Sequence, residues 1–128
     1  MILVDTSVWI EYFHLKNQKL YLDLAQRLEE DQLCISVVTR IELLTGISKK
    51  HKAKFSNALN VLTTYYPDVK DWMTIELWIE QGREDGFQFQ ISDLMIASAA
   101  QKNNCEIYTL DGDFKRMEKY GWVRLFQS

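Results

Sequence analysis

Short runs rich in aliphatic, β-branched or aromatic side chains alternate with longer amphipathic segments along the chain. The clearest of these runs cover residues 2–4, 33–35, 63–66 and 107–110, and each is bounded by polar or turn residues. Runs of this length and composition predict short β-strands packed in a sheet. A further run at 122–125 predicts a last strand, which brings the expected total to four to five.

Between these runs, apolar residues recur at the spacing of an α-helix. Leu20, Leu24 and Leu28 are separated by charged residues, which predicts an amphipathic helix. Ser36 is expected to begin a second helix, and Ser92 is expected to be the N-cap of a later one. The remaining helical stripes consist of Val37, Ile41 and Leu44; of Phe55, Ala58, Leu59 and Leu62; of Trp72, Ile75 and Ile79; and of Leu94, Ile96, Ala97 and Ala100.

Strands that alternate with helices, without tandem hairpin signals, indicate an α/β fold. Right-handed crossovers would then give a parallel sheet covered on both faces. The chain has 128 residues, of which 47% are hydrophobic, with one Pro and five Gly. This composition supplies enough apolar surface for a compact core and argues against extensive disorder. Because the sequence contains no repeat, low-complexity tract or linker, we expect a single domain over residues 1–128.

The overall charge is slightly acidic. The formal net charge is −3 and the sequence pI is about 5.4. A protein that coats nucleic acid would be strongly basic, so any nucleic acid must be held locally. The basic stretch at residues 49–54 can steer phosphates, although a run of this kind is more often a solvated helix connection.

The two cysteines and the start of the chain indicate a cellular compartment. Cys34 and Cys105 are far apart in the sequence and each lies beside an apolar run. This spacing fits neither a disulfide framework nor paired zinc ligands, so we expect buried thiols in a reducing compartment. The chain opens on an apolar run without a basic n-region, and no apolar stretch is long enough to cross a membrane. These features predict a cytoplasmic protein.

Four acidic residues occupy the boundaries of the predicted elements. Asp5 and Asp111 follow strands at their carboxyl ends, where parallel sheets collect their ligands. Asp93 and Glu42 lie near the starts of two helices, so the four side chains are predicted to share one cleft. Crowded carboxylates repel one another unless a cation compensates them, and hard oxygen ligands suit Mg²⁺ or Mn²⁺. One or two such ions would activate water and neutralise charge on a phosphodiester, which predicts hydrolysis of a nucleic-acid backbone.

Each of these acids also has a purely structural interpretation. Asp5 can be the N-cap of the helix that follows it, and Glu42 follows Thr39 with the spacing of a capping box. Asp93 can complement a helix dipole, and the Asp111-Gly112 pair can form a hairpin turn. No acid is diagnostic alone, and the functional interpretation depends on the four together.

Four motifs together resemble those of the PIN-domain ribonucleases and occur in that family's order. Individually the motifs are loose, but jointly they are specific. The resemblance covers essentially the whole chain, and its length and early first motif look most like the VapC-like bacterial toxins. The motifs are Leu3-Val4-Asp5-Thr6-Ser7-Val8-Trp9, Ser36-Val37-Val38-Thr39-Arg40-Ile41-Glu42-Leu43, Ser92-Asp93-Leu94-Met95-Ile96-Ala97 and Thr109-Leu110-Asp111-Gly112-Asp113-Phe114.

The resemblance implies a three-layer α/β/α sandwich and a metal-dependent endoribonuclease that cleaves RNA. By the same resemblance, the catalytic residues that also bind Mg²⁺ or Mn²⁺ are Asp5, Glu42, Asp93 and Asp111, with Asp113 as an auxiliary metal ligand. It further implies a homodimer and, for a toxin of a type II toxin-antitoxin pair, inhibition by a small antitoxin whose basic segment enters the acidic cleft.

Two threonines adjoin the proposed ligands. Thr6 follows Asp5, and Thr109 lies two residues before Asp111. Their hydroxyl groups can hold a carboxylate or a water molecule in place. The alternative is a packing role, which is common for a threonine in or beside a strand.

Two other functions are compatible with this pattern. A receiver-like signalling domain also ends its strands with acids and would accept phosphate on Asp5 or Asp111. Such a domain would need a lysine after a late strand, where this sequence has Asp111, and it would leave Glu42 without a role. The second alternative is a non-catalytic PIN-fold module that binds protein or RNA, which the acidic pI allows.

Overall fold

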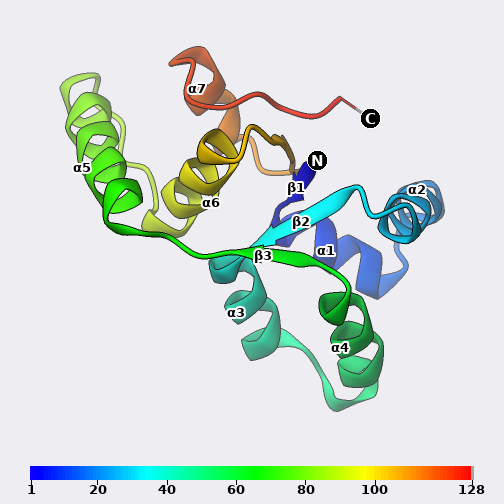
Figure 1. Cartoon of the computed structure of the whole chain (residues 1–128). Coiled ribbons are helices and arrows are strands. Elements are labelled where there is room, and N and C mark those ends of the chain that lie inside the picture. The colour runs from blue at the N-terminus through cyan, green and yellow to red at the C-terminus, as the bar shows by residue number, and fades with distance from the viewer. Residues whose placement is uncertain (128) are drawn as a thin grey trace.

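Four short parallel strands form the centre of the fold in the computed structural model, which describes residues 1–127 (Figure 1). They are β1 (Ile2–Val4), β2 (Leu33–Ser36), β3 (Thr63–Tyr65) and β4 (Glu106–Tyr108). Their order across the sheet is β3-β2-β1-β4, so β1 lies in the interior although it comes first in the chain. Leu3 of β1 therefore has Cys34 of β2 on one side and Ile107 of β4 on the other.

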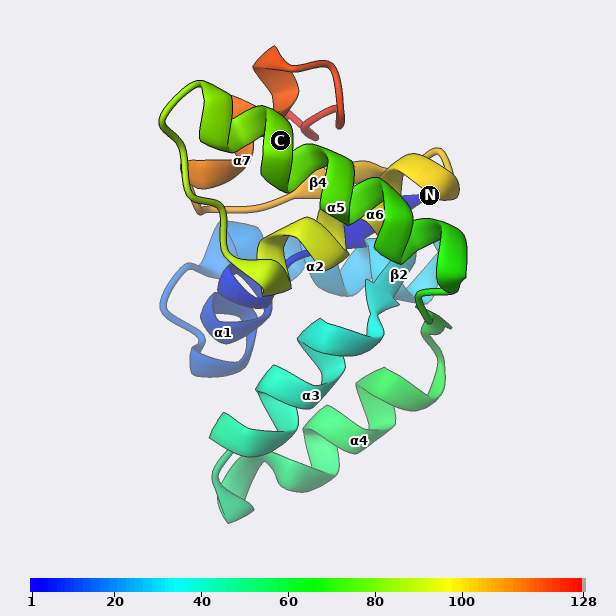
Figure 2. The same cartoon turned by 90° about the vertical axis from the view of Figure 1, so that its left-hand side faces the viewer.

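Helices cover both faces of this sheet (Figures 1 and 2). Their bounds are α1 (Thr6–His14), α2 (Gln18–Glu29), α3 (Val37–Gly46), α4 (Lys52–Asn60), α5 (Val69–Glu84), α6 (Ile91–Lys102) and α7 (Asp113–Lys119), with a 3-10 helix η1 at Lys49–His51. The first face is covered by α1 and α2, whose core cluster also includes residues of α4, and the second face is covered by α5, α6 and α7. Helix α3 contacts α1 and α6 and extends with α4 away from the sheet, as Figure 2 shows. No helix in the described part of the chain is long and apolar enough to span a bilayer.

Alternate residues of the strands face opposite layers, which explains why the inner strand β1 is apolar throughout. Ile2 and Val4 belong to the cluster beneath α1, α2 and α4, whereas Leu3 belongs to the cluster beneath α5, α6 and α7. In β2, Ile35 and Cys34 divide in the same way. A parallel strand buried on both faces needs an uninterrupted apolar run. The expected three-layer α/β/α sandwich is confirmed, with four strands among the described residues.

The prediction that both cysteines are buried thiols is also confirmed. Cys34 and Cys105 are free, and their sulfur atoms lie 3.6 Å apart inside the second layer. Burial, followed by the neighbouring Cys105 thiol, raises the pKa of Cys34 above its ordinary range. These thiols therefore pack as small apolar groups.

Two strand predictions need correction. Strand β4 ends at Tyr108, not at residue 110, because the next backbone N–H groups donate to side-chain hydroxyls. The expected fifth strand at 122–125 is wrong, since the structure has only an isolated bridge between Ile107 and Leu125 there. Trp122 and Val123 both enter the second core cluster, which the alternation of a strand does not permit.

Two helix predictions also differ from the structure. The N-cap of α6 is Gln90, and Ser92 lies inside the first turn of the helix. Helix α3 buries Thr39 and Leu43, so the apolar stripe that includes Ile41 and Leu44 faces outward instead. The reason is tertiary, because α3 packs on α1 through its other side.

Two leucines of α2 test how strongly this core stabilises the fold. Leu24 is 0% exposed and Leu22 is 58% exposed. We expect Leu24→Ala to lower the free energy of unfolding by about 2–5 kcal/mol, because it removes buried methyl groups and leaves a cavity. The matched control Leu22→Ala should change it by less than about 0.5 kcal/mol. Urea unfolding measures both, and equal effects would contradict the assignment of the buried face of α2.

Candidate active site

The proposed acidic residues converge at the carboxyl end of the sheet. Asp5 directly follows β1 and is 4% exposed, while Asp111 lies three residues after β4. Asp93 is in the first turn of α6, and Asp113 is the first residue of α7. Glu42 extends from α3, in its second turn. Because neighbouring parallel strands end at the same edge, residues distant in sequence reach one site.

Three of the carboxylates form the tightest group. Asp93, Asp111 and Asp113 each offer one oxygen, and these oxygens all lie within 4.8 Å of one another. Asp93 and Asp111 are half-buried and Asp113 is exposed. Asp113, which the sequence suggested only as an auxiliary ligand, is thus one of the three, whereas Asp5 and Glu42 are not.

The electrostatics of Asp93 connect all five acids. The pKa of Asp93 is raised to about 7, first by burial and then by the charges of the other four acids, in the order Asp111, Asp5, Asp113 and Glu42. Each of these carboxylates is therefore close enough to disfavour the ionised form of Asp93. The five acids share one electrostatic environment.

Two hydroxyl groups hold the Asp5 side chain. Ser7 Oγ donates to Asp5 Oδ2 at 2.9 Å, and Thr109 Oγ1 donates to the same oxygen at 2.8 Å. Asp5 occupies the N-cap position of α1, but its side chain makes no capping hydrogen bond. Asp5 is therefore the N-cap residue of α1 by position, as one interpretation predicted, but its carboxylate does not cap the helix and is oriented by hydroxyls from α1 and from the segment after β4.

Glu42 is held across the gap between two helices. Thr6 Oγ1, at the start of α1, donates to Glu42 Oε1 at 2.8 Å. The N-cap of α3 is Ser36, which accepts from the N–H of Val38, and Thr39 is fully buried. The capping-box interpretation of Glu42 is thus wrong.

Asp111 lies in a turn that leads into a helix, so the hairpin interpretation is also wrong. Its Oδ1 accepts the N–H of Asp113 at 3.0 Å. Its own N–H donates to Thr109 Oγ1, also at 3.0 Å. The Thr109 hydroxyl consequently bonds both Asp5 and the backbone of Asp111, and it ties the two strand ends together.

Ser7 is a site residue that the sequence analysis did not identify. Its hydroxyl donates to Asp5 and accepts the N–H of Leu110 at 3.0 Å. A serine two residues after an acid at a strand-to-helix turn was the available signal. Its contact with Leu110, more than a hundred positions away, was not visible in the sequence.

The donor set fits a hard divalent cation. Carboxylate oxygens are the ligands that Mg²⁺ and Mn²⁺ prefer, and a cation would relieve the repulsion that raises the pKa of Asp93. The hydroxyls of Thr6, Ser7 and Thr109 restrict the carboxylates that they bond, as residues behind metal ligands commonly do.

Comparison with known proteins shows the family. The family model described as PIN domain matches residues 2–120. The chain belongs to the PIN-domain family. Ribonuclease VapC1 of Methanocaldococcus jannaschii is 30% identical over 123 residues, which cover 94% of this PIN domain and 83% of that protein.

Solved structures show the same fold. VapBC2 from Rickettsia felis, bound to a DNA fragment from its promoter, has a TM-score of 0.77 and 22% identity, with 98% of each chain covered. VapBC-5 from Mycobacterium tuberculosis, a member of the VapBC family of toxin-antitoxin systems, has a TM-score of 0.65 and 23% identity, with 98% of this chain and 97% of that chain covered. This PIN domain therefore has the architecture expected from the sequence.

The raised pKa of Asp93 predicts a pH-dependent stability of the metal-free PIN domain. Between the ordinary value of 3.8 and about 7, the folded state keeps a proton that the unfolded state has released. Stability is therefore lost as the pH rises through this range. Asp93→Asn removes the effect, so its free energy of unfolding relative to wild type should rise by about 1–2 kcal/mol from about pH 4 to about pH 8. This estimate is well below the full linkage value because solvent screens a half-exposed carboxylate.

Urea unfolding in EDTA at the two pH values measures this difference. Glu84→Gln, at an exposed position of α5, is the matched control and should follow wild type. Saturating Mn²⁺ should make wild type more stable than Asp93→Asn, because the ion stabilises only the chain with the intact site. If the free energy of unfolding of Asp93→Asn differs from that of wild type by the same amount at both pH values, the raised pKa attributed to the clustered acids is contradicted.

Proposed function

We propose that the chain acts as a single nuclease domain, a metal-dependent endoribonuclease that hydrolyses RNA phosphodiester bonds. The observation that carries this proposal is the convergence of four other acids on Asp93, at the end of the sheet of a PIN domain. The similarity to a ribonuclease at 30% identity supports RNA as the substrate class.

In this proposal Asp5, Glu42, Asp93 and Asp111 are the catalytic residues that bind Mg²⁺ or Mn²⁺. The closeness of its oxygen to those of Asp93 and Asp111 supports adding Asp113 to the ligands. A divalent cation supplies positive charge against the phosphodiester and makes water a stronger nucleophile at neutral pH. The carboxylates bind and orient it, and in its absence they repel the phosphates of RNA.

The threonines act through these carboxylates. Thr109 fixes Asp5 relative to Asp111, and Thr6 fixes Glu42 relative to α1. During hydrolysis, a bond forms between the water oxygen and phosphorus as the bond to the leaving oxygen breaks. Carboxylates held in place before the reaction would keep a bound cation in position, so that no reorganisation is needed as negative charge develops on the phosphate.

We also propose that the protein is the toxin of a type II toxin-antitoxin pair in the cytoplasm. Similar solved structures include VapBC assemblies, and the two buried free thiols suit a reducing compartment. An antitoxin segment with basic side chains would complement the acidic cleft. Co-expression with the neighbouring gene product should suppress RNA cleavage, and undiminished cleavage in a purified complex would oppose this role.

An apolar stripe on α5 supports a homodimer. Val69, Trp72, Met73 and Leu77 lie on the side of α5 opposite its buried residues, and Leu77 is 71% exposed. Contiguous exposed apolar surface of this kind marks protein interfaces. Light scattering should give about twice the chain mass of 15.1 kDa for wild type, and the mass of one chain for Leu77→Asp. Leu22→Asp on α2 is the control, and loss of the dimer in both variants would show a general effect of charge.

Cleavage of a mixed RNA pool tests the enzymatic proposal. Metal-stripped protein should be inactive in EDTA and regain activity with Mn²⁺ or Mg²⁺. Asp5→Asn and Asp93→Asn should each lower the rate by about 10²–10³-fold, as when a group that stabilises transition-state charge is removed. Glu84→Gln should keep the wild-type rate, and single-stranded DNA is the substrate control.

The alternatives correspond to distinct outcomes. Metal-dependent cleavage that persists in Asp93→Asn would contradict the assignment of the catalytic site. No cleavage by wild type after removal of any bound inhibitor would favour the binding module. The receiver-like alternative has little support, because the family is the PIN domain and Asp111 stands where a lysine would be needed.

A further inference from the structure

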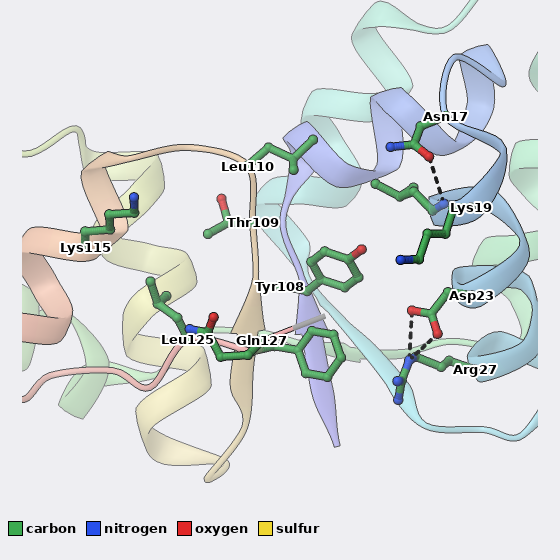
Figure 3. Close-up of a pocket in the computed structure, with 12 residues that line it drawn as sticks. Asn17, Lys19, Asp23, Arg27, Tyr108, Thr109, Leu110, Lys115, Leu125 and Gln127 are labelled. Carbon is green, nitrogen blue, oxygen red and sulfur yellow. Dashed lines mark hydrogen bonds and ion pairs between the residues drawn. The ribbon is translucent and has the colours of Figure 1, made fainter.

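A separate groove adjoins the carboxylate site beyond residues 109–111. Its volume is about 490 Å³, and it lies between α2 and the start of α7, with β4 and the C-terminal segment at its base (Figure 3). Clefts of roughly 300–1,000 Å³ hold ligands of drug size, a range that includes a nucleotide.

The groove and the proposed catalytic site share Thr109. This residue lines the groove, and its hydroxyl bonds Asp5 and the backbone of Asp111. The next residue, Leu110, is 57% exposed and forms the lip between the two regions. The groove and the proposed catalytic site are therefore adjacent, close enough to contact neighbouring parts of one RNA strand.

The charge of the groove is opposite to that of the catalytic site. Its lining contains three cationic side chains and one carboxylate, namely Lys19, Arg27, Lys115 and Asp23. Asp23 pairs with Arg27 at 3.1 Å. Lys19 and Lys115 stand on opposite walls in Figure 3, and within residues 1–127 neither takes part in an ion pair. In a chain of net charge −3, this local pair of cations stands out.

Aromatic side chains form part of the base of the groove. The rings of Tyr108 and Phe126 have centroids 5.0 Å apart, and the guanidinium of Arg27 lies 4.8 Å from the centroid of Phe126. Phe126 is only half-buried, so it presents a surface to the groove. Cations that follow a backbone, combined with aromatic or guanidinium faces for stacking, are the features that bind single-stranded nucleic acid.

We propose that this groove binds the single-stranded RNA segment adjacent to the cleaved phosphodiester. Lys19 and Lys115 contact its phosphates, and Phe126 with Arg27 provides a stacking surface for a base. The proposal rests on the endoribonuclease function proposed above and extends the same site. It explains how an acidic protein holds a polyanion beside a cluster of carboxylates.

The salt dependence of RNA binding tests this proposal. A labelled single-stranded RNA of about 12 nucleotides is titrated with full-length protein in EDTA, where no cleavage is expected, and binding is measured by anisotropy. The double variant Lys19→Gln/Lys115→Gln should bind about 10–30-fold more weakly at about 0.1 M salt. The slope of log K against log salt is negative, and its magnitude should decrease by about 1.4, because two phosphate contacts are lost at about 0.7 each.

The matched control is Lys70→Gln/Arg83→Gln, which has the same net charge as the groove variant but changes two exposed cations of α5 outside the groove lining. It should keep the wild-type affinity and slope. Phe126→Leu retains an apolar side chain and should weaken binding by about fivefold or more without changing the slope, because stacking releases no counterions.

The outcomes separate this proposal from the enzymatic one. If wild type cleaves RNA but the groove variant binds and cleaves like wild type, the groove proposal is overturned and the nuclease stands. Equal weakening of RNA binding by the control variant also overturns it. If wild type shows no metal-dependent cleavage, the proposed function fails first. A groove variant that still binds RNA with wild-type affinity but no longer binds a co-expressed protein partner would assign the groove to protein docking instead.

Discussion

Repulsion among carboxylates constrains the whole functional end of this PIN domain. The pKa of Asp93 is raised first by partial burial and then by the charges of four other acids. Such an arrangement disfavours the metal-free folded state and is relieved by a bound cation. The surrounding structure is organised to hold these groups in place against their repulsion.

Hydrogen bonds from three hydroxyl groups hold Asp5 and Glu42 in place. Thr109 joins Asp5 to the backbone of Asp111, Ser7 joins Asp5 to the segment after β4, and Thr6 joins α1 to Glu42. These bonds connect elements that are adjacent in space but distant along the chain. They are effective because β1 is packed on both sides by neighbouring strands and on both faces by helices, so its end has little freedom to move.

Charge is divided sharply over a short distance at the loop after β4. Its Asp111 belongs to the acidic site, whereas Thr109 lines a groove with Lys19 and Lys115, which take part in no ion pair among residues 1–127. A modest net charge conceals this division, since opposite regions cancel in the total. In the proposed nuclease, this local separation of charge would let metal binding and phosphate binding occur side by side.

Much of the fold and part of the site could be predicted from the sequence. Apolar runs located the strands, helical spacing located most helices, and the position of acids after those runs indicated the cleft. These features are local, and each is a property of neighbouring residues that any packing must respect.

Only the tertiary structure decided the rest. It showed that Asp113 stands in the closest carboxylate group, that Ser7 orients Asp5, and that the apolar stripe of α3 faces outward. It also ended β4 at Tyr108 and reduced the expected fifth strand to a single bridge. Each of these outcomes depends on contacts between segments far apart in sequence. Local patterns carry no information about such contacts until the sheet order brings the segments together.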